Sequence, residues 1–178
     1  MPFSALTCQV LQHYTTHTAL MESVWYGPWN TILTTLFPAS DGFQVIPQRK
    51  LADEDDYEST IPDFIIEVSK ATELGGLNFQ LVLIVEIKNS HHWPNGEGRL
   101  FVQLCKQANS AFSHAARRKL YWIGVIGPHW RYGSKEDDGQ LELSPLIPWH
   151  HTTHDDASFD DLQTLAGLAG ALVTLGNA

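Results

Sequence analysis

The chain has 178 residues, of which 43% are hydrophobic, and it carries a formal net charge of −9 at pH 7. A chain of this length builds one hydrophobic core and leaves little room for a second, so we expect a single domain over residues 1–178. Twenty acidic against eleven basic residues argue against a protein that binds nucleic acid through a broadly basic surface, although a local basic cleft is compatible with this charge.

Cysteine usage and hydropathy favour an intracellular protein. Cys8 and Cys105 lie in segments expected to be helical, without the paired spacing of a disulfide-rich secreted domain, so both are expected to be reduced. Residues Met1–Val10 lack the basic start and apolar run of a signal peptide, and the apolar stretch Leu81–Val85 is too short to span a bilayer. We expect a cytoplasmic or nuclear location, no secretion and no membrane partner.

The first forty residues are predicted to be helical. Ser4–Trp25 contains apolar residues at helical spacing and no proline, which favours one amphipathic helix. Pro28 is interpreted as a break. Trp29–Phe37 has apolar residues at helical spacing and Pro38 just beyond its end, which predicts a second, short helix.

Three strands are expected next. Phe43–Ile46 predicts the first strand, which leads into an acidic loop over Ala52–Thr60. Asp63–Val68 and Phe79–Lys88 predict two clearer strands, and Gly75-Gly76 between them is typical of a turn that joins antiparallel neighbours.

A long helix is expected after this hairpin. Apolar residues from Leu100 to Ala115 recur at intervals of three and four, and Arg117, Arg118 and Lys119 follow at the far end. These cations suit the negative end of the helix dipole, an interpretation that we favour over a phosphate-binding patch.

The remaining elements extend the sheet and add a terminal helix. Leu120–Ile126 is a continuous apolar run and predicts a buried strand, and His129–Gly133 is expected to pair with Leu141–Leu146 across a loop. A C-terminal helix is expected at about 158–175, beginning near Ser158 with acidic residues in its first turn.

The end of the central strand carries the residues that point to chemistry. Glu86-Ile87-Lys88 directly follows the apolar run Leu81–Val85, where charges need a reason to be present. Because side chains alternate along a strand, Glu86 and Lys88 share one face, and the backbone carbonyl of Ile87 remains available as an oxygen ligand.

The hairpin is expected to bring a second carboxylate to the same place. Pairing that is symmetric about Gly75-Gly76 places Asp63 opposite Lys88, on the same face of the sheet. Oxygen ligands from Asp63, Glu86 and the Ile87 carbonyl match a hard octahedral ion, so Mg²⁺ or Mn²⁺ is favoured over zinc. Lys88 would then lie beside the attacking water.

Pro62-Asp63 followed by Glu86-Ile87-Lys88, on adjacent strands and before a helix, resembles the signature of the PD-(D/E)XK, restriction-endonuclease-like nuclease superfamily. The resemblance covers about Ser4–Ile126. It implies an α/β fold with an αβββαβ core, in which a central mixed sheet of four to five strands is flanked by helices. The segment Gly127–Tyr132 also resembles one in uncharacterised fungal members of this superfamily.

The resemblance implies a function and further site residues. It implies a metal-dependent nuclease that hydrolyses phosphodiester bonds in DNA or RNA, in which the acids hold Mg²⁺ and Lys88 orients or deprotonates water. A lysine that acts as a base needs a depressed pKa, and the sequence leaves these two roles open. The superfamily also often has a glutamate on the first helix that contacts a metal-bound water, and a glutamine on the helix after the lysine. The candidates here are Glu22 for the former, and Gln103 and Gln107 for the latter.

Other interpretations of the same residues remain open. Asp63, Glu86 and Lys88, here called the triad, can instead form a buried salt bridge of Lys88 with Glu86 or Asp63. The chain can be a catalytically inactive interaction or regulatory module, or a metal-dependent enzyme that acts on a small, nonpolymeric substrate. A nuclease needs basic side chains along a groove that leads to Asp63, and a homodimer is compatible with a chain of this size. The basic residues available for such a groove are Lys70, Arg99, Lys106, Arg131 and the run Arg117–Lys119.

Nine histidines invite a zinc interpretation, which we consider weaker than that of ordinary loop histidines. His91-His92 follows the triad, and His150-His151 with His154 lies in a Thr-rich segment without companion cysteines. The tryptophans and tyrosines of this half of the chain can stack on bases, but core packing is the more common role.

Overall fold

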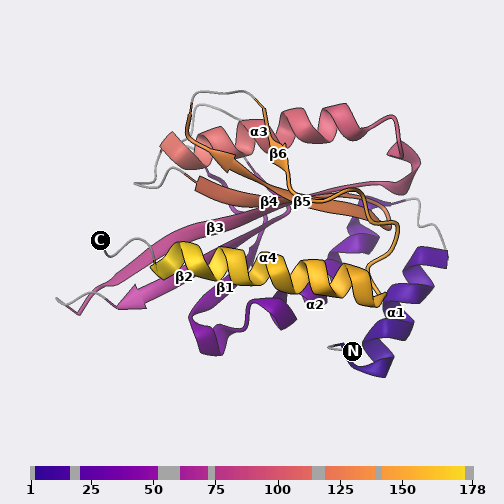
Figure 1. Cartoon of the computed structure of the whole chain (residues 1–178), viewed down its shortest axis with the longest axis horizontal. Helices are drawn as coiled ribbons and strands as arrows, with labels where there is room; N and C mark the ends of the chain where they lie inside the picture. Colours follow the sequence, from indigo (N-terminus) through magenta and orange to yellow (C-terminus); the bar gives the residue numbers. More distant parts are fainter. Residues whose placement is uncertain are drawn as a thin grey trace.

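A mixed six-stranded sheet, in which the strand order follows the chain order, organises the protein (Figure 1). The computed structural model describes residues 3–16, 21–51, 61–71, 75–113, 119–138 and 142–174. Every pair of neighbouring strands is antiparallel except β3 and β4, which are parallel. The strands are β1 (Phe43–Pro47), β2 (Phe64–Ala71), β3 (Leu77–Lys88), β4 (Lys119–Ile126), β5 (His129–Glu136) and β6 (Ser144–Pro145).

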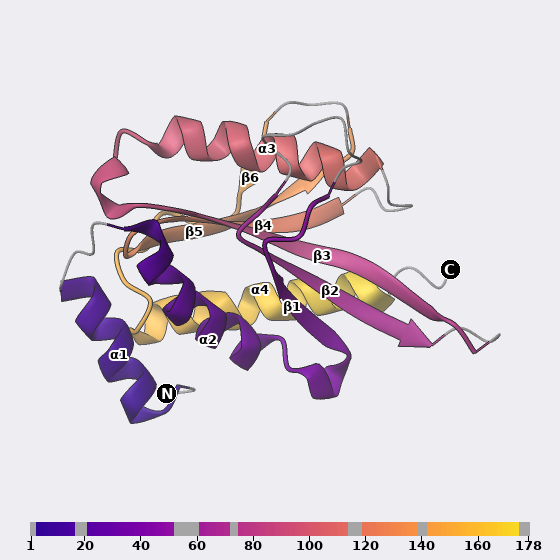
Figure 2. The ribbon, with the colours of Figure 1, turned by 180° about the vertical axis from the view of Figure 1, so that it is seen from behind.

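Helices cover both faces of the sheet (Figure 2). The helix α3 provides the crossover that a parallel pair of strands requires, between β3 and β4. It packs on one face, while α1, α2 and α4 lie on the other. The α-helices are α1 (Ala5–Thr16), α2 (Tyr26–Leu36), α3 (Glu97–Ser113) and α4 (Asp156–Thr174), and the short 3-10 helices are η1 (Glu22–Trp25), η2 (Ala39–Asp41) and η3 (Ser90–His92).

The alternation of side chains along β3 divides the core into two layers. Leu83, Val85 and Ile87 are buried in the layer that contains α2 and α4, and Ile84 is buried in the layer beneath α3. Glu86 has the same parity as Ile84, so its side chain projects toward α3. The predicted α/β fold is therefore confirmed, with one strand more than the largest sheet expected.

The predicted single helix over Ser4–Trp25 is wrong. The first helix ends at Thr16, and Glu22 lies in the separate helix η1. The hydroxyls of Thr15 and Thr16 donate to backbone carbonyls in the preceding turn, and such β-branched, self-bonding residues lower helix propensity. Pro28 is not a break, because it lies in the first turn of α2, where a backbone N–H has no helical partner to lose.

The predicted register of the β2–β3 hairpin is also wrong. Phe64 pairs with Val85, and the register shifts between Ile66 and Glu67. Next to the turn, Ala71 already pairs with Leu77, three residues away from the partner that symmetry about the glycines would give, and the extra residue at the shift changes this offset by only one. Continuing the observed register by one residue places Asp63 beside Glu86 rather than opposite Lys88.

The remaining elements agree with expectation, apart from their ends. The strands near residues 43–46 and 120–126 and the long helix after the hairpin are confirmed. The pairing of β5 with β6 through Gly133 and Pro145 confirms the final hairpin, although β5 extends into the expected loop. The C-terminal helix begins at Asp156, two residues early, and the Ser158 N–H donates to Asp155 Oδ1 at 2.8 Å. The acidic loop over residues 52–60, together with Arg117 and Arg118, lies outside the described residues.

None of the helices in the described part of the chain has both the length and the apolar character needed to cross a bilayer.

Two glycines provide a test of the packing. A Cβ at Gly133 would collide with the Ser144 carbonyl and the Trp122 ring, whereas a Cβ at Gly167, on an exposed part of α4, meets nothing within 4 Å. We expect Gly133→Ala to lower the free energy of unfolding by about 3 kcal/mol or more, because buried backbone must move. Gly167→Ala should raise it by roughly 0.5–1 kcal/mol through helix propensity. Urea unfolding of both variants measures these changes, and a stable Gly133→Ala protein would contradict the packing of β6 on β5.

Candidate active site

Three of the residues singled out from the sequence come together at the end of the central strands. Asp63 directly precedes β2, and Glu86 and Lys88 end β3. Lys88 Nζ donates to Glu86 Oε1 at 2.6 Å, and the Ile87 backbone N–H donates to Asp63 Oδ2 at 2.7 Å. The convergence expected from strand alternation is therefore present, despite the different register.

One of the two candidate glutamines reaches this group. Gln107 is fully buried on α3, and its Nε2 donates to Glu86 Oε2 at 2.7 Å. Gln103 lies one turn earlier and is half-buried, and no hydrogen bond among the described contacts joins it to Asp63 or Glu86. The helical period alone does not distinguish the two glutamines, because both lie on the same face of α3.

Tyr26 is a site residue that the sequence did not indicate. Its hydroxyl donates to Asp63 Oδ1 at 2.5 Å and lies 3.4 Å from Glu22 Oε1. Glu22 thus approaches the site through Tyr26 and from η1 rather than from the first helix. Only the four-residue interval between Glu22 and Tyr26 hinted at their proximity, and that signal depends on both residues lying in continuous helical structure.

Burial raises the pKa of both central carboxyls. Glu86 is 2% exposed and Asp63 is 8% exposed. Loss of solvent is the main cause for Glu86, and the neighbouring Asp63 charge adds to it, so that its pKa rises to about 7 despite Lys88 and Gln107. Loss of solvent also raises the pKa of Asp63, against the hydrogen bonds from Tyr26 and Ile87 and the charge of Lys88. The pKa of the more exposed Glu22 rises for the same primary reason.

Lys88 remains a cation in this environment. Burial by itself lowers its pKa, but the charges of Glu86, Glu22 and Asp63 and the hydrogen bond to Glu86 outweigh burial and raise it. A lysine with a raised pKa is a poor general base. Of the two roles left open by the sequence, this electrostatic setting favours the ammonium that positions water and neutralises charge.

The donor set fits a hard divalent cation. Each oxygen of Asp63 and Glu86 accepts one protein hydrogen bond and keeps a further lone pair. The carbonyl of Ile87 lies on the same edge of β3 as its N–H, and therefore on the side of Asp63. When both are ionised, the two buried carboxylates exceed the single ammonium by one negative charge, which a cation would compensate. Among the described residues, no group of three or more His, Cys, Asp or Glu side chains is placed to hold a metal. Mg²⁺ does not need such a group, because it is commonly held by one or two carboxylates and water.

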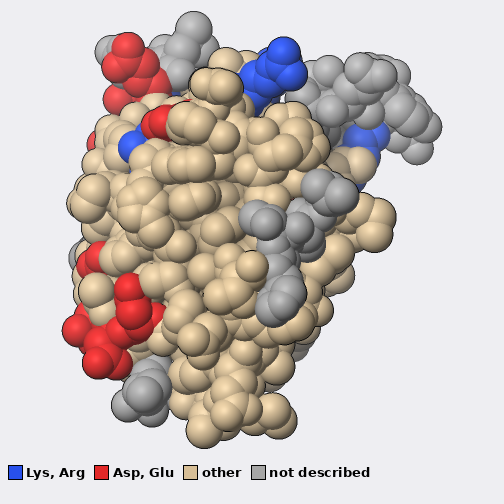
Figure 3. Space-filling model, turned by 90° about the vertical axis from the view of Figure 1, so that its right-hand side faces the viewer, with Lys and Arg blue, Asp and Glu red and all other residues tan. Residues whose placement is uncertain are grey.

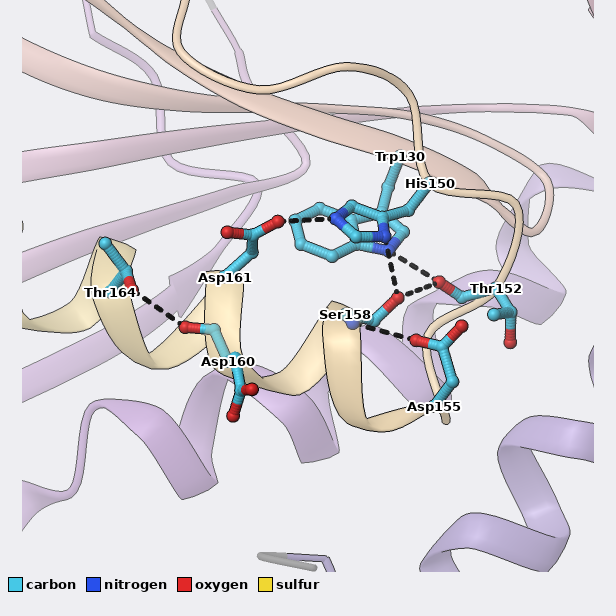
Figure 4. Close-up of polar contacts among 8 residues, drawn as sticks. All are labelled: Trp130, His150, Thr152, Asp155, Ser158, Asp160, Asp161 and Thr164. Carbon is cyan, nitrogen blue, oxygen red and sulfur yellow. Dashed lines mark hydrogen bonds and ion pairs between the residues drawn. The ribbon is translucent and has the colours of Figure 1, made fainter.

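A second polar cluster has the connectivity of a hydrolytic triad (Figure 4). His150 Nδ1 lies 3.2 Å from Ser158 Oγ, and His150 Nε2 lies 2.7 Å from Asp161 Oδ2. However, Ser158 is fully buried and its hydroxyl donates to the Thr152 carbonyl at 2.6 Å, so no substrate can reach it. The imidazole also stacks on Trp130 with ring centroids 4.7 Å apart. This cluster joins the segment before α4 to the sheet and does not form a nucleophilic site.

The contacts of the described histidines give no support to the zinc interpretation, which we considered the weaker one from the sequence. His150 is engaged by Ser158 and Asp161, and the His154 ring is hydrogen-bonded to the Thr152 hydroxyl. His151 pairs instead with His129, with their Nδ1 atoms 2.9 Å apart. His91 and His92 contact each other in η3. These partners account for the histidines as structural and loop residues.

Among the described basic side chains that were considered for a nuclease groove, some are engaged in ion pairs and others are exposed on α3. Arg131 is bound to Glu97 at 2.7 Å and lies against the rings of Phe101 and Trp149, and Lys119 pairs with Glu136. The face in Figure 3 shows acidic side chains at lower left and at upper left, with basic side chains at separate places in its upper half. On α3, Arg99 and Lys106 are exposed. The side chain of Lys70 lies outside the described part of the chain.

Comparisons of this chain with protein-family models, with curated proteins and with solved structures gave no match.

The raised pKa of Glu86 predicts a stability profile that depends on pH. A carboxyl whose pKa rises from 4.5 to about 7 on folding makes the folded protein bind more protons than the unfolded chain between these values. The stability that this group contributes is therefore complete below pH 4.5 and lost as the pH rises through 7. The free energy of unfolding of Glu86→Gln should increase relative to wild type between pH 5 and 8, by at most roughly 3 kcal/mol at about 1.4 kcal/mol per pKa unit.

Urea unfolding of both proteins across this pH range measures the difference. Glu142→Gln removes the same charge from an exposed position and serves as the control. A difference between Glu86→Gln and wild type that stays constant with pH would show that Glu86 ionises normally.

Proposed function

We propose that this protein is a metal-dependent nuclease of the PD-(D/E)XK, restriction-endonuclease-like superfamily, which hydrolyses phosphodiester bonds in DNA or RNA. The observation that carries the proposal is the convergence of two buried carboxylates, from Asp63 and Glu86, with the ammonium of Lys88. A salt bridge needs only one acid for one lysine, and the second buried carboxylate raises the electrostatic cost. A cation-binding site accounts for both acids.

The order of the elements supports the same proposal. The segment from α2 to β4 consists of a helix, three antiparallel strands, a helix and a strand parallel to the third. This order corresponds to the αβββαβ core that the resemblance implies. The acids lie at the β2–β3 pair and the lysine follows two residues after the second acid, as in the signature.

Asp63, Glu86 and the Ile87 carbonyl would hold Mg²⁺ or Mn²⁺, which when bound polarises the scissile phosphate and lowers the pKa of coordinated water. The other steps belong to the side chains themselves. Lys88 orients the attacking water by hydrogen bonding and offsets the negative charge that develops on the phosphate. Gln107 donates a hydrogen bond to Glu86 Oε2 and so fixes the orientation of the Glu86 carboxylate.

One observation favours a second candidate. The net charge of −9 and the pairing of Arg131 with Glu97 leave few basic side chains to bind a polyanion. A metal-dependent enzyme that acts on a small substrate requires only the site and not a basic groove. The same argument applies to an inactive module that retains the site as a structural feature.

Metal binding is the first test, because it does not depend on the substrate. A thermal-shift titration with Mg²⁺ or Mn²⁺ should raise the wild-type Tm by roughly 3–5 °C at ten times the dissociation constant, since ligand binding stabilises the folded state by about 1.4 kcal/mol there. Asp63→Asn should abolish this increase. Asp160→Asn, which removes one negative charge from an exposed position on α4, should retain it. An equal increase in Tm for Asp63→Asn and Asp160→Asn would show that the ion binds at a site that does not include Asp63.

Cleavage is the second test. Wild type, Asp63→Asn and Lys88→Ala are incubated with single- and double-stranded DNA and RNA in the presence of Mg²⁺ or Mn²⁺, and products are separated on denaturing gels. We expect cleavage by the wild type, none by Asp63→Asn and a loss of about 10²–10³-fold in Lys88→Ala, the size typical of removing one electrostatic stabiliser. Metal binding without cleavage of any nucleic acid would favour the second candidate. Cleavage that survives Lys88→Ala would remove the role given to this lysine.

A further inference from the structure

The Asp63 carboxylate is held at both oxygens by donors from different parts of the chain. The Ile87 N–H binds Oδ2 from the adjacent strand β3. The Tyr26 hydroxyl binds Oδ1 from α2, at a separation of 37 residues in the chain. A carboxylate bonded at both oxygens cannot rotate freely about its terminal torsion, which is otherwise broad.

The ring of Tyr26 is itself fixed. Tyr26 is the first residue of α2 and is half-buried, and its ring contacts Phe64 edge to face, with centroids 5.9 Å apart. Phe64 directly follows Asp63 in the chain. The residue that holds the Tyr26 ring is therefore the chain neighbour of the residue that carries the carboxylate. This contact keeps the Tyr26 hydroxyl close to Asp63 Oδ1.

Gln48 stabilises the same arrangement from a third segment. Its φ is +47°, in the left-handed region that non-glycine residues seldom adopt. Its backbone N–H donates to the Asp63 carbonyl at 3.0 Å, and its side chain interacts with the Tyr26 hydroxyl. Left-handed non-glycine residues persist where the surrounding structure holds them, and they concentrate at functional sites.

We infer that Tyr26 is a positioning residue, which, supported by Gln48, fixes the orientation of the Asp63 carboxylate toward the cation of the active site. The inference rests on the proposed function, because Asp63 needs a fixed orientation only if it is a ligand. Packing does not require the hydroxyl, since a phenylalanine at this position would make the same ring contact with Phe64. The hydroxyl is therefore the part of Tyr26 that acts on Asp63.

Tyr26→Phe tests the inference, because it removes the hydroxyl and keeps the ring. Titration with Mn²⁺, followed by the electron paramagnetic resonance signal of the free ion, measures metal affinity without any substrate. We expect affinity to fall by about 10–100-fold, the usual effect of removing a group that orients a metal ligand. We also expect kcat for nucleic-acid cleavage to fall while KM changes little, at a Tm close to that of the wild type. Tyr14→Phe removes an equivalent hydroxyl from α1 and should leave affinity and kcat unchanged.

The outcomes separate this inference from the proposed function. A wild-type protein that binds Mn²⁺ and cleaves nucleic acid, with a Tyr26→Phe variant of equal affinity and kcat, overturns the positioning role alone. A wild-type protein that binds no Mn²⁺ overturns the proposed function and the inference together. If Tyr26→Phe is poorly folded, Gln48→Gly serves as a second variant, because it keeps the N–H to Asp63 and tolerates the positive φ. Loss of its side chain should weaken Mn²⁺ binding in the same direction, and unchanged affinity would count against the inference.

Discussion

A carboxylate buried at the end of the central strand sets the requirements for the rest of this site. Glu86 is almost completely removed from water, and an ionised group in such a place is strongly destabilising unless it is paired and hydrogen-bonded. Lys88 and Gln107 each satisfy one of its oxygens. The nearby Asp63 reverses part of that gain, because a second negative charge opposes the ionisation of the first. When both acids are ionised, the group carries one negative charge that Lys88 does not offset, which is the basis of our proposal that it holds a divalent cation.

Most of the residues of this site lie at or beside the ends of helices and strands. Asp63 precedes one strand, Glu86 and Lys88 end the next, Tyr26 begins α2 and Gln107 faces the sheet from the middle of α3. Because these helices and strands are packed on the core, the polar side chains at the site are held by a rigid backbone.

The surface and the second polar cluster show how the same kinds of residue serve structural purposes elsewhere. Ser158, His150 and Asp161 are connected like a catalytic triad, yet burial of the hydroxyl leaves them only a role in docking α4. Arg131, one of the basic residues that the sequence offered for a nucleic-acid groove, lies against two aromatic rings and is bound to Glu97. Residue type alone does not separate catalytic from structural roles, because accessibility and hydrogen-bond partners decide between them.

The sequence by itself determined the alternation along the central strand, and with it the shared face of Glu86 and Lys88, because the period of a strand is a local property of the backbone. It also determined the general order of helices and strands, which follows from local hydrophobic periodicity. Only the tertiary structure decided the register beside Asp63, because the pairs of β2 with β3 are not symmetric about Gly75-Gly76 and shift by one further residue between Ile66 and Glu67. Only the tertiary structure identified Tyr26, whose contact with Asp63 joins segments that no local pattern relates. It likewise selected Gln107 over Gln103, since the depth of a side chain between α3 and the sheet is set by packing and not by helical spacing.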